Sequence, residues 1–421
     1  MPRVALIADR HGMAEYAKKA GADVVVVHEP ADPADQIAGF CQQTIARPLD
    51  DPSGIVAALR PLHEQQPFSR VLTTNEEGVL AAAVATAELA PAELGLQGNS
   101  VESVLALKDK SLTRQAMERH DIAPVRHRVV SSAAELEDFH REIGDHIIVK
   151  PMDSMASANV HLIAEPDGTG DAWRQLVAAG YRTALAEEYL RGPEVSVETL
   201  SVRGEHHVVS INEHLLNDYF VAVGHTMPSR ITGDHFAELC SLTRRLLDAV
   251  GLFEGPSHTE FILTERGPRI VESQSRMAGA GVGELERRSH GVNRARLAVT
   301  VPLGLEQVPA GLPLDGGGAA IRFFVPRPGE VTAIRGLDAV DATLTHTGID
   351  TYGRTMNELL DFAGVEVGVR LAAQVGDVVP EIQSGLERRM GYVVASGRDG
   401  ADAALRAESV MNRIEIETRP I

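Results

Sequence analysis

The chain has few cysteines, few aromatic residues and no long apolar run. Its two cysteines, Cys41 and Cys240, cannot form a disulfide framework and lack the spacing of a metal-binding motif. The sequence opens on the strand-like run Val4–Ala8 rather than on the apolar segment of a signal peptide, and no later run approaches membrane length. We therefore expect a protein of a reducing compartment, the cytoplasm, without a membrane segment.

Positive charge is also scarce. The 421 residues include 40 Lys and Arg against 59 Asp and Glu, which gives a net charge of −19. An acidic surface repels phosphate backbones and anionic lipids, so nucleic acids and membranes are poor candidates as partners. Hydrophobic residues are 44% and charged residues 24%, an ordinary globular composition. At this length we expect roughly three domains.

The glycine-rich motifs of common nucleotide-binding folds are absent, because no G-x-G-x-x-G follows a strand and there is no Walker A sequence. Alternating strand and helix patterns predict instead an N-terminal parallel sheet with helices on its faces. The predicted elements are strands at Val4–Ala8, Asp23–Val27 and Val71–Thr74, with helices at Met13–Ala20 and up to Glu88. Ligands bind at strand ends of such sheets, here at Thr73–Glu77.

A second region, from Glu102 to Leu305, begins with a helix that carries Lys108 and Lys110 and is predicted to bury Leu112, Ala116 and Met117. Further strands are predicted at Ile147–Lys150, Thr183–Leu190, Val195–Leu200, Thr259–Thr264 and Ile270–Ser275. The Pro- and Gly-rich run Pro309–Gly318 is the clearest linker. An α+β module follows, with a strand at Gly391–Ser396 and a helix that presents Ala403, Ala407 and Val410 on one face.

The most informative stretch is a predicted hairpin over Thr259–Arg276. A three-residue loop, Glu265-Arg266-Gly267, would place Thr264 opposite Pro268 and Glu260 opposite Glu272, with Cβ atoms about 5 Å apart. Alternation predicts two shared faces, with Glu260, Ile262 and Thr264 on the first strand and Ile270, Glu272, Gln274 and Arg276 on the second. Opposed carboxylates favour a hard cation such as Mg²⁺ between them. A solvated strand face is the alternative.

Three weaker signals accompany the hairpin. Lys150 ends an apolar strand before a small, polar segment, residues 152–159, whose N–H groups could approach an anion; an edge-strand lysine and an ordinary turn are the alternative. Glu187 and Glu194 flank a strand–turn–strand unit and could bind an adenine amine and ribose hydroxyls, or simply be exposed. Lys108-Asp109-Lys110 opens an amphipathic helix, and lysines on the outer face of a helix are normally just solvated.

In this order the segments resemble the ATP-grasp superfamily of carboxylate–amine ligases over nearly the whole chain. The resemblance implies an α/β and α+β protein: a pre-ATP-grasp parallel α/β domain at 1–105, an ATP-grasp domain at 106–306 and a C-terminal α+β module at 307–421. In the ATP-grasp domain two α+β subdomains sandwich ATP, with the lid at about 112–186. Leu94–Ser100 resembles the segment before the family's D-K motif, and Met390–Gly397 resembles the C-terminal module of biotin carboxylase and amino-acid ligases.

The resemblance also implies roles for single residues. The implied ATP contacts are Lys110 and Lys150 on the phosphates, Ser154 and Ser157 in a phosphate loop whose usual glycines are Ser and Ala here, Glu187, Glu188 and Leu190 on adenine, and Glu194 on ribose. The implied metal ligands, for two Mg²⁺ ions that Mn²⁺ can replace, are Glu260, Glu272 and Gln274, the last in place of the usual Asn. Arg276 and Lys150 would be catalytic, and His258, Arg276, Gly279 and Gly281 would bind substrate. For His258, two residues before Glu260, a structural histidine is the alternative.

The implied reaction is ATP-dependent amide or peptide bond formation through an acyl phosphate, with release of ADP and phosphate. The segments Gly255–Glu260 and Glu272–Arg276 most resemble the L-amino-acid (dipeptide) ligases. A biotin-carboxylase-like or purine-pathway enzyme and a nucleotide-binding regulatory protein without turnover stay open as alternatives. We expect a small carboxylate and an amine as substrates, a homodimer by family habit, and specificity in loops at Asn212–Ser229 and Gly279–Glu286.

Overall fold

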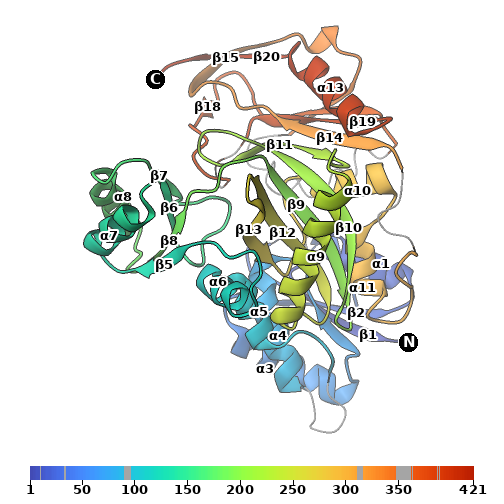
Figure 1. Cartoon of the computed structure of the whole chain (residues 1–421). Helices are drawn as coiled ribbons and strands as arrows, with labels where there is room; N and C mark the ends of the chain where they lie inside the picture. Colours follow the sequence, from blue (N-terminus) through green and yellow to red (C-terminus); the bar gives the residue numbers. More distant parts are fainter. Residues whose placement is uncertain are drawn as a thin grey trace.

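The computed structural model describes residues 1–421 except 10, 33–34, 90–95, 311–315, 348–361, 363, 386 and 388. The predicted linker Pro309–Gly318 and the stretch Leu94–Ser100 therefore lie partly outside the described residues. The described strands form four sheets, and the largest of them has nine strands (Figure 1). Among the described helices, none is long and apolar enough to cross a lipid bilayer.

The N-terminal part is a parallel sheet, as predicted; it has four strands in the order β3-β2-β1-β4, and β3 was not predicted. Its elements are β1 (Arg3–Ile7), α1 (Met13–Lys19), β2 (Asp23–His28), α2 (Asp35–Ala38), β3 (Gln43–Ala46), α3 (Pro52–Gln65), β4 (Arg70–Leu72), the 3-10 turn η1 (Glu76–Gly78) and α4 (Val79–Leu89). Buried aliphatic side chains on both faces, such as Val25 and Val26, explain the strong strand signal. Thr73–Glu77 directly follow β4 at the carboxyl end of the sheet.

The predicted helix around Lys108 is in fact two helices, α5 (Val101–Lys108) and α6 (Lys110–Arg119). Asp109 leaves the helical conformation and caps α6, because its side chain accepts hydrogen bonds from the N–H groups of Ser111 and Leu112. Ala116 and Met117 are buried as predicted. The prediction for Leu112 is wrong: it is exposed, because the buried face of α6 runs through Lys110, Thr113, Arg114 and Met117 and leaves Leu112 outside it.

The lid is an antiparallel sheet with order β5-β8-β6-β7, which projects from the rest of the molecule on one side (Figure 1). Its elements are β5 (His127–Val130), α7 (Ala133–Ile143), β6 (Ile147–Lys150), β7 (His161–Ile163), α8 (Gly168–Ala178) and β8 (Ala184–Glu188). Both helices pack on one face through a core that includes Leu136, Phe139 and Leu176. The other face is thereby left to the loops that surround Lys150.

One nine-stranded sheet, β13-β12-β9-β10-β11-β14-β19-β17-β16, joins the central part to the C-terminal part. Its strands are β9 (Glu194–Val202), β10 (Glu205–Leu216), β11 (Ala222–Met227), β12 (Gly255–Thr264), β13 (Gly267–Gln274), β14 (Gly318–Phe323), β16 (Thr343–His346), β17 (Val367–Leu371) and β19 (Gly391–Gly397). The associated helices are α9 (Gly233–Ala249), α10 (Val282–His290), α11 (Arg294–Thr300) and α13 (Gly400–Met411). Helix α9 covers an apolar face of the sheet that includes Val195, Val197 and Phe261.

A small sheet, β18-β15-β20, completes the C-terminal part. It contains β15 (Gly329–Arg335), β18 (Val378–Val379) and β20 (Glu415–Arg419), and the 3-10 turn η2 (Leu337–Ala339) follows β15. In α13, Ala403 and Ala407 are buried in the core beside β19, as the helical spacing predicts. The chain thus has the mixed α/β and α+β fold that the sequence indicated.

The β12–β13 hairpin differs from the prediction in its loop. Thr264 pairs with Gly267 rather than lying opposite Pro268, so the loop has two residues, Glu265 and Arg266. A β-bulge then leaves Val271 without a partner strand residue and restores the predicted pairing of Glu260 with Glu272. The bulge also shifts the alternation of side chains along β13, so that the residues before Val271 lie on the opposite face of the strand from the one predicted. Ile270 lies in the core with Phe261, and so does not share a face with Glu272 as predicted.

Candidate active site

A cavity of about 520 Å³ lies where the lid, the large sheet, the N-terminal strand ends and the C-terminal part meet. Its wall includes the predicted residues Lys110, Lys150, Ser154, Ser157, Glu187, Glu188, Leu190, Glu194, His258, Glu260, Glu272, Arg276 and Gly279. Gln274 and Gly281 are not on this wall: Gln274 lies behind Glu272, and Gly281 begins α10. Residues far apart in the chain therefore converge as predicted.

Two buried lysines occupy one end of the cavity. Lys110, at the start of α6, lies 3.1 Å from Glu272 Oε2 and donates to the carbonyl of Ser154 at 2.6 Å. Burial lowers the pKa of Lys110, but the neighbouring Glu272, Glu260 and Glu187 outweigh it and raise the pKa above its ordinary value. Lys150, the last residue of β6, lies 2.7 Å from Glu187 Oε2. This end therefore concentrates positive charge in an acidic protein.

Glu187 is held between two cations, Lys150 and Arg114 of α6. Burial raises the pKa of Glu187, but Arg114 and Lys150 outweigh it and hold the pKa at about 2. Arg114 also donates to the carbonyls of Ile270, at 2.6 Å, and Val271, at 3.0 Å, beside the bulge. Sequence reasoning missed Arg114, although its spacing of four from Lys110 places both on one helix face. The predicted contact of the Glu187 side chain with adenine stays a prediction.

The hinge after β8 and the predicted phosphate loop after β6 both contribute residues to the cavity wall. The Glu188 carboxylate accepts hydrogen bonds from the Arg126 N–H and from Arg266, and Glu188 also lies on the cavity wall. In the phosphate loop, Ala156, Ser157 and Asn159 have φ of 56°, 58° and 59°. Glycine adopts this left-handed conformation freely and other residues rarely do, so the loop is strained.

Two tethers hold the strained loop. The Ser157 hydroxyl donates to the Phe220 carbonyl at 2.9 Å, and the Gly385 N–H donates to the Ala156 carbonyl at 2.7 Å. Gly385 belongs to the C-terminal part, which also adds Glu387 and Arg389 to the cavity wall. The C-terminal part therefore supports the loop from outside the lid.

The paired carboxylates form a donor set that fits Mg²⁺. Glu272 Oε1 accepts from Gln274 Nε2 at 2.7 Å, while Glu260 Oε1 lies 2.9 Å from His258 Nε2. Burial raises the pKa of Glu260, but the hydrogen bond and charge of His258 outweigh it and hold the pKa at about 2. Gln274 Oε1 is buried and has no hydrogen-bond partner among the described residues. Carboxylate and amide oxygens are ligands suited to a hard cation.

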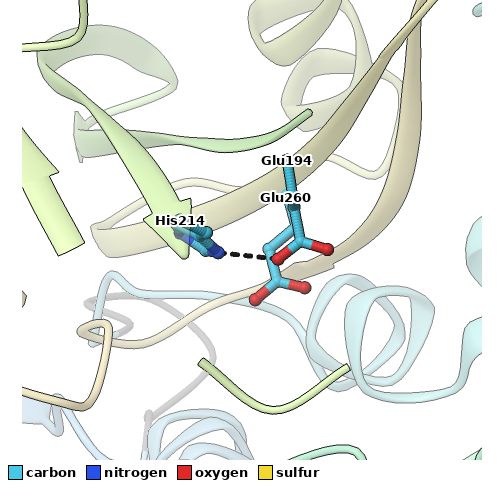
Figure 2. A group of neighbouring side chains, drawn as sticks. All are labelled: Glu194, His214 and Glu260. Atoms are coloured by element: carbon cyan, nitrogen blue, oxygen red, sulfur yellow. Dashed lines mark hydrogen bonds and ion pairs between the residues drawn. The ribbon is translucent and has the colours of Figure 1, made fainter. Parts of the chain in front are cut away.

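Glu194, His214 and Glu260 point toward one another from β9, β10 and β12 (Figure 2), with ligand atoms within 4.8 Å of one another. His214 Nδ1 lies 2.7 Å from Glu194 Oε1. Burial and the charge of Glu260 raise the pKa of Glu194 despite His214. The prediction of a specificity loop at Asn212–Ser229 is wrong for most of that range, since β10 and β11 occupy it and carry His214 and His225 on strands. Alternating polar residues were the missed signal.

The other end of the cavity is built around Arg276, just beyond β13. Its Nε lies 3.3 Å from Glu76 Oε2, and Glu76 also accepts from Lys108 at 2.9 Å. Glu76 belongs to the strand end Thr73–Glu77 that was predicted to bind ligands, and Thr74, Asn75 and Glu77 line the cavity with it. Gly279 is on the wall nearby. The cavity therefore extends beyond the lysine end, which leaves room for a second molecule.

Three family models match the sequence. They describe an ATP-grasp N-terminal domain at residues 14–90, an ATP-grasp domain at 143–284 and an L-amino acid ligase C-terminal domain 2 at 356–419. The chain is an ATP-grasp protein. One relative of this ATP-grasp protein is alanine–anticapsin ligase of Bacillus subtilis (strain 168), with 24% identity over 257 residues, 55% of this chain and 53% of the relative. The chain thus spans about half the length of the curated relatives it matches first.

Solved structures share the fold over nearly the whole chain. L-amino acid ligase from Bacillus licheniformis aligns with a TM-score of 0.77 and 20% identity, covering 100% of this chain and 99% of the other. The biotin carboxylase domain of Hydrogenobacter thermophilus 2-oxoglutarate carboxylase, in complex with MgADP, aligns with a TM-score of 0.68 and 14% identity, covering 98% and 90%. Both similarities establish the ATP-grasp fold. Since enzymes of different chemistry share that fold, it does not choose between them.

Proposed function

We propose that this ATP-grasp protein is an ATP-dependent, ADP-forming carboxylate–amine ligase. It would join an amino acid or small carboxylic acid to an amine through an acyl phosphate. The observation that carries the proposal is one cavity in which Lys110, Lys150 and the Glu260–Glu272 pair lie beside Arg276. The L-amino acid ligase C-terminal domain and the similarity to alanine–anticapsin ligase favour this chemistry over biotin carboxylation.

The lysine end suits the nucleotide. Lys110 and Lys150 would neutralise the phosphates, and the apolar strip of Ile148, Leu190 and Ile262 would cover the base. One or two Mg²⁺ ions, held by Glu260 and Glu272 with Gln274 Oε1 beside them, would supply further positive charge to the transferred phosphoryl group. Glu194 would bind the ribose. Because this work is mainly positioning and charge neutralisation, no covalent nucleophile is needed.

The Arg276 end suits the acid and the amine. The substrate carboxylate would attack the γ-phosphorus, forming its C–O–P bond as the bond to ADP breaks. The amine would then attack the acyl carbon, lose a proton and displace phosphate. The planar guanidinium of Arg276 can hold first the carboxylate and then the acyl phosphate through paired N–H donors. The homodimer stays a prediction.

Isotope transfer tests the proposal. Amino acids labelled with ¹⁸O in the carboxylate should pass label to phosphate in the presence of ATP and Mg²⁺. Arg276→Lys should slow product formation about a hundredfold or more while ATP binding survives. Arg296→Lys, an exposed arginine on α11, is the matched control. A wild-type chain that never moves label refutes the ligase. If the Arg276→Lys variant forms product at the wild-type rate, Arg276 only forms an ion pair with Glu76 and does not act on the substrate.

A further inference from the structure

A fully buried carboxylate, Glu198 of β9, lies beneath the cavity wall with an exposure of 0%. Its Oε2 lies 2.6 Å from Nη2 of Arg294, which has a side-chain exposure of 0%. Arg294 is fixed in turn by Glu286 at 3.1 Å and by the carbonyls of Ser257 and Thr199. Burying a carboxylate costs several kcal/mol unless a cation and hydrogen bonds satisfy it. Arg294 occupies one oxygen of Glu198 and leaves the other to face the cavity side.

Two chains of hydrogen bonds, here called branches, start from this second oxygen, Oε1. In the first, Glu198 Oε1 lies 2.6 Å from His258 Nδ1, and His258 Nε2 lies 2.9 Å from Glu260 Oε1. Both nitrogens of this imidazole therefore have a carboxylate acceptor, which fixes the ring plane and, through it, the Glu260 side chain. His258 therefore orients Glu260 along the cavity-facing side of β12.

In the second branch, the Ser196 hydroxyl donates to Glu198 Oε1 at 2.9 Å. A carboxylate only accepts, so the single proton of Ser196 is committed and its oxygen accepts from His214 Nε2, at 2.9 Å. The other nitrogen, Nδ1, lies 2.7 Å from Glu194 Oε1, as the dashed line in Figure 2 marks. The orientation of Glu194 is therefore set by Glu198 through two intermediates.

The strand order explains why Glu198 alone can act on both Glu260 and Glu194. Glu194, Ser196 and Glu198 alternate along β9 and share its cavity face. β12 pairs with β9 on one side, with His258 opposite Glu198 and Glu260 opposite Ser196. β10 pairs on the other side, with Asn212 opposite Ser196, so His214 comes next beside Glu194. A central strand can hold side chains from both neighbours, whereas an edge strand cannot.

We infer that Glu198, anchored by Arg294, is a positioning residue for two cavity carboxylates at once. It holds Glu260 through His258, and Glu194 through Ser196 and His214. The inference rests on the proposed function, in which Glu260 binds metal and Glu194 binds ribose. Groups that orient metal ligands from behind typically change metal affinity 10- to 100-fold when removed. The two branches predict separable effects on metal and on nucleotide.

Two binding measurements separate the branches without turnover. Mn²⁺ affinity is followed by electron paramagnetic resonance in the absence of nucleotide. Ribose recognition is followed by calorimetry as the preference for ADP over 2′,3′-dideoxy-ADP. His258→Gln should weaken Mn²⁺ binding about 10- to 100-fold and keep the ADP preference. Ser196→Ala should reduce the ADP preference and keep Mn²⁺ affinity. Glu198→Gln should do both.

Glu254→Gln is the matched control, because Glu254 is also buried and paired with an arginine, Arg70 at 3.1 Å, but does not touch either branch. It should lower the melting temperature and leave both affinities unchanged. If Glu198→Gln fails to fold, the two branch variants decide. Wild-type affinities in the branch variants, or losses of both affinities in each, overturn the inference. A wild-type chain that binds no Mn²⁺, or a Glu272→Gln variant with unchanged Mn²⁺ affinity, refutes instead the proposed metal site and with it the Glu260 branch.

Discussion

Gly385 lies so close to the phosphate loop that a single methyl group should displace it. A Cβ built on Gly385 would lie 2.8 Å from Ala156 Cβ and 3.3 Å from the Ala156 carbonyl oxygen. Real Cβ atoms essentially never approach within 3.0 Å, and Ala156 Cβ is fixed by its backbone. In Gly385→Ala the loop and the residue 385 segment must therefore move apart, whichever of them shifts, and this stretches the 2.7 Å hydrogen bond from the residue 385 N–H.

The expected effect is a moderate loss of ATP affinity. A lost backbone hydrogen bond is worth about 0.5–1.5 kcal/mol, and about 1.4 kcal/mol is tenfold in affinity. If the loop covers the phosphates, Gly385→Ala should bind ATP about two- to tenfold more weakly. The Ser157–Phe220 tether limits the movement, so complete loss of binding is not expected.

Calorimetry with a non-hydrolysable ATP analogue measures this change. Gly39→Ala is the control, since a Cβ there meets nothing within 4 Å. Ala156→Gly provides the sharper test, because it removes the clashing methyl group and relieves the positive φ of Ala156. The double variant Ala156→Gly/Gly385→Ala should recover most of the lost affinity. Gly385→Ala that matches Gly39→Ala, or a double variant that recovers nothing, would contradict a loop supported from the C-terminal part.

Two further changes address the metal and the buried charges. Glu272→Gln should abolish Mg-ATP-dependent turnover while circular dichroism shows an intact fold. Turnover near the wild-type rate would show that Glu272 is not a metal ligand. Burial raises the pKa of Glu286 to about 7, with Glu198 adding to the shift and Arg294 opposing it. Its stabilising contribution is therefore complete below about pH 4.5 and is lost as pH rises through 7. Between pH 5 and pH 8, Glu286→Gln should lose about 2.5 kcal/mol less stability than the wild type, so its melting temperature should fall about 3 °C less; an unchanged pH profile would contradict this.

Local patterns were enough to predict some of the strands, among them β1, β6 and β12, and the Glu260–Glu272 pair. The pairing was right although the loop was wrong, because the bulge at Val271 adds back the residue that the shorter loop removes. The bulge itself was not predictable from local sequence. The carbonyls of Ile270 and Val271 are held there by Arg114, which lies 156 and 157 positions away in the chain.

The residues that the sequence failed to reveal are those that act through tertiary register. Glu198 and Arg294 are 96 positions apart, and their contact depends on where α11 packs against the sheet. His214 reaches Glu194 only because β10 pairs with β9 in one particular register. Periodicity indicates which face a residue occupies, but it does not say which strand comes next. Motif residues could therefore be named in advance, whereas the residues that orient them could not.

The continuity of the nine-stranded sheet limits how this protein could acquire a new substrate. β11 pairs directly with β14, from Gly224 opposite Arg322 to Met227 opposite Ala319, so the C-terminal part is not a detachable unit. Exchanging it for a homologous segment would expose unpaired strand edges unless that register were reproduced. The positions around Thr74–Glu77, by contrast, follow a strand end and carry no such pairing. Divergence among such chains should therefore proceed by point changes at this strand end, with the lysine end inherited intact, rather than by module exchange.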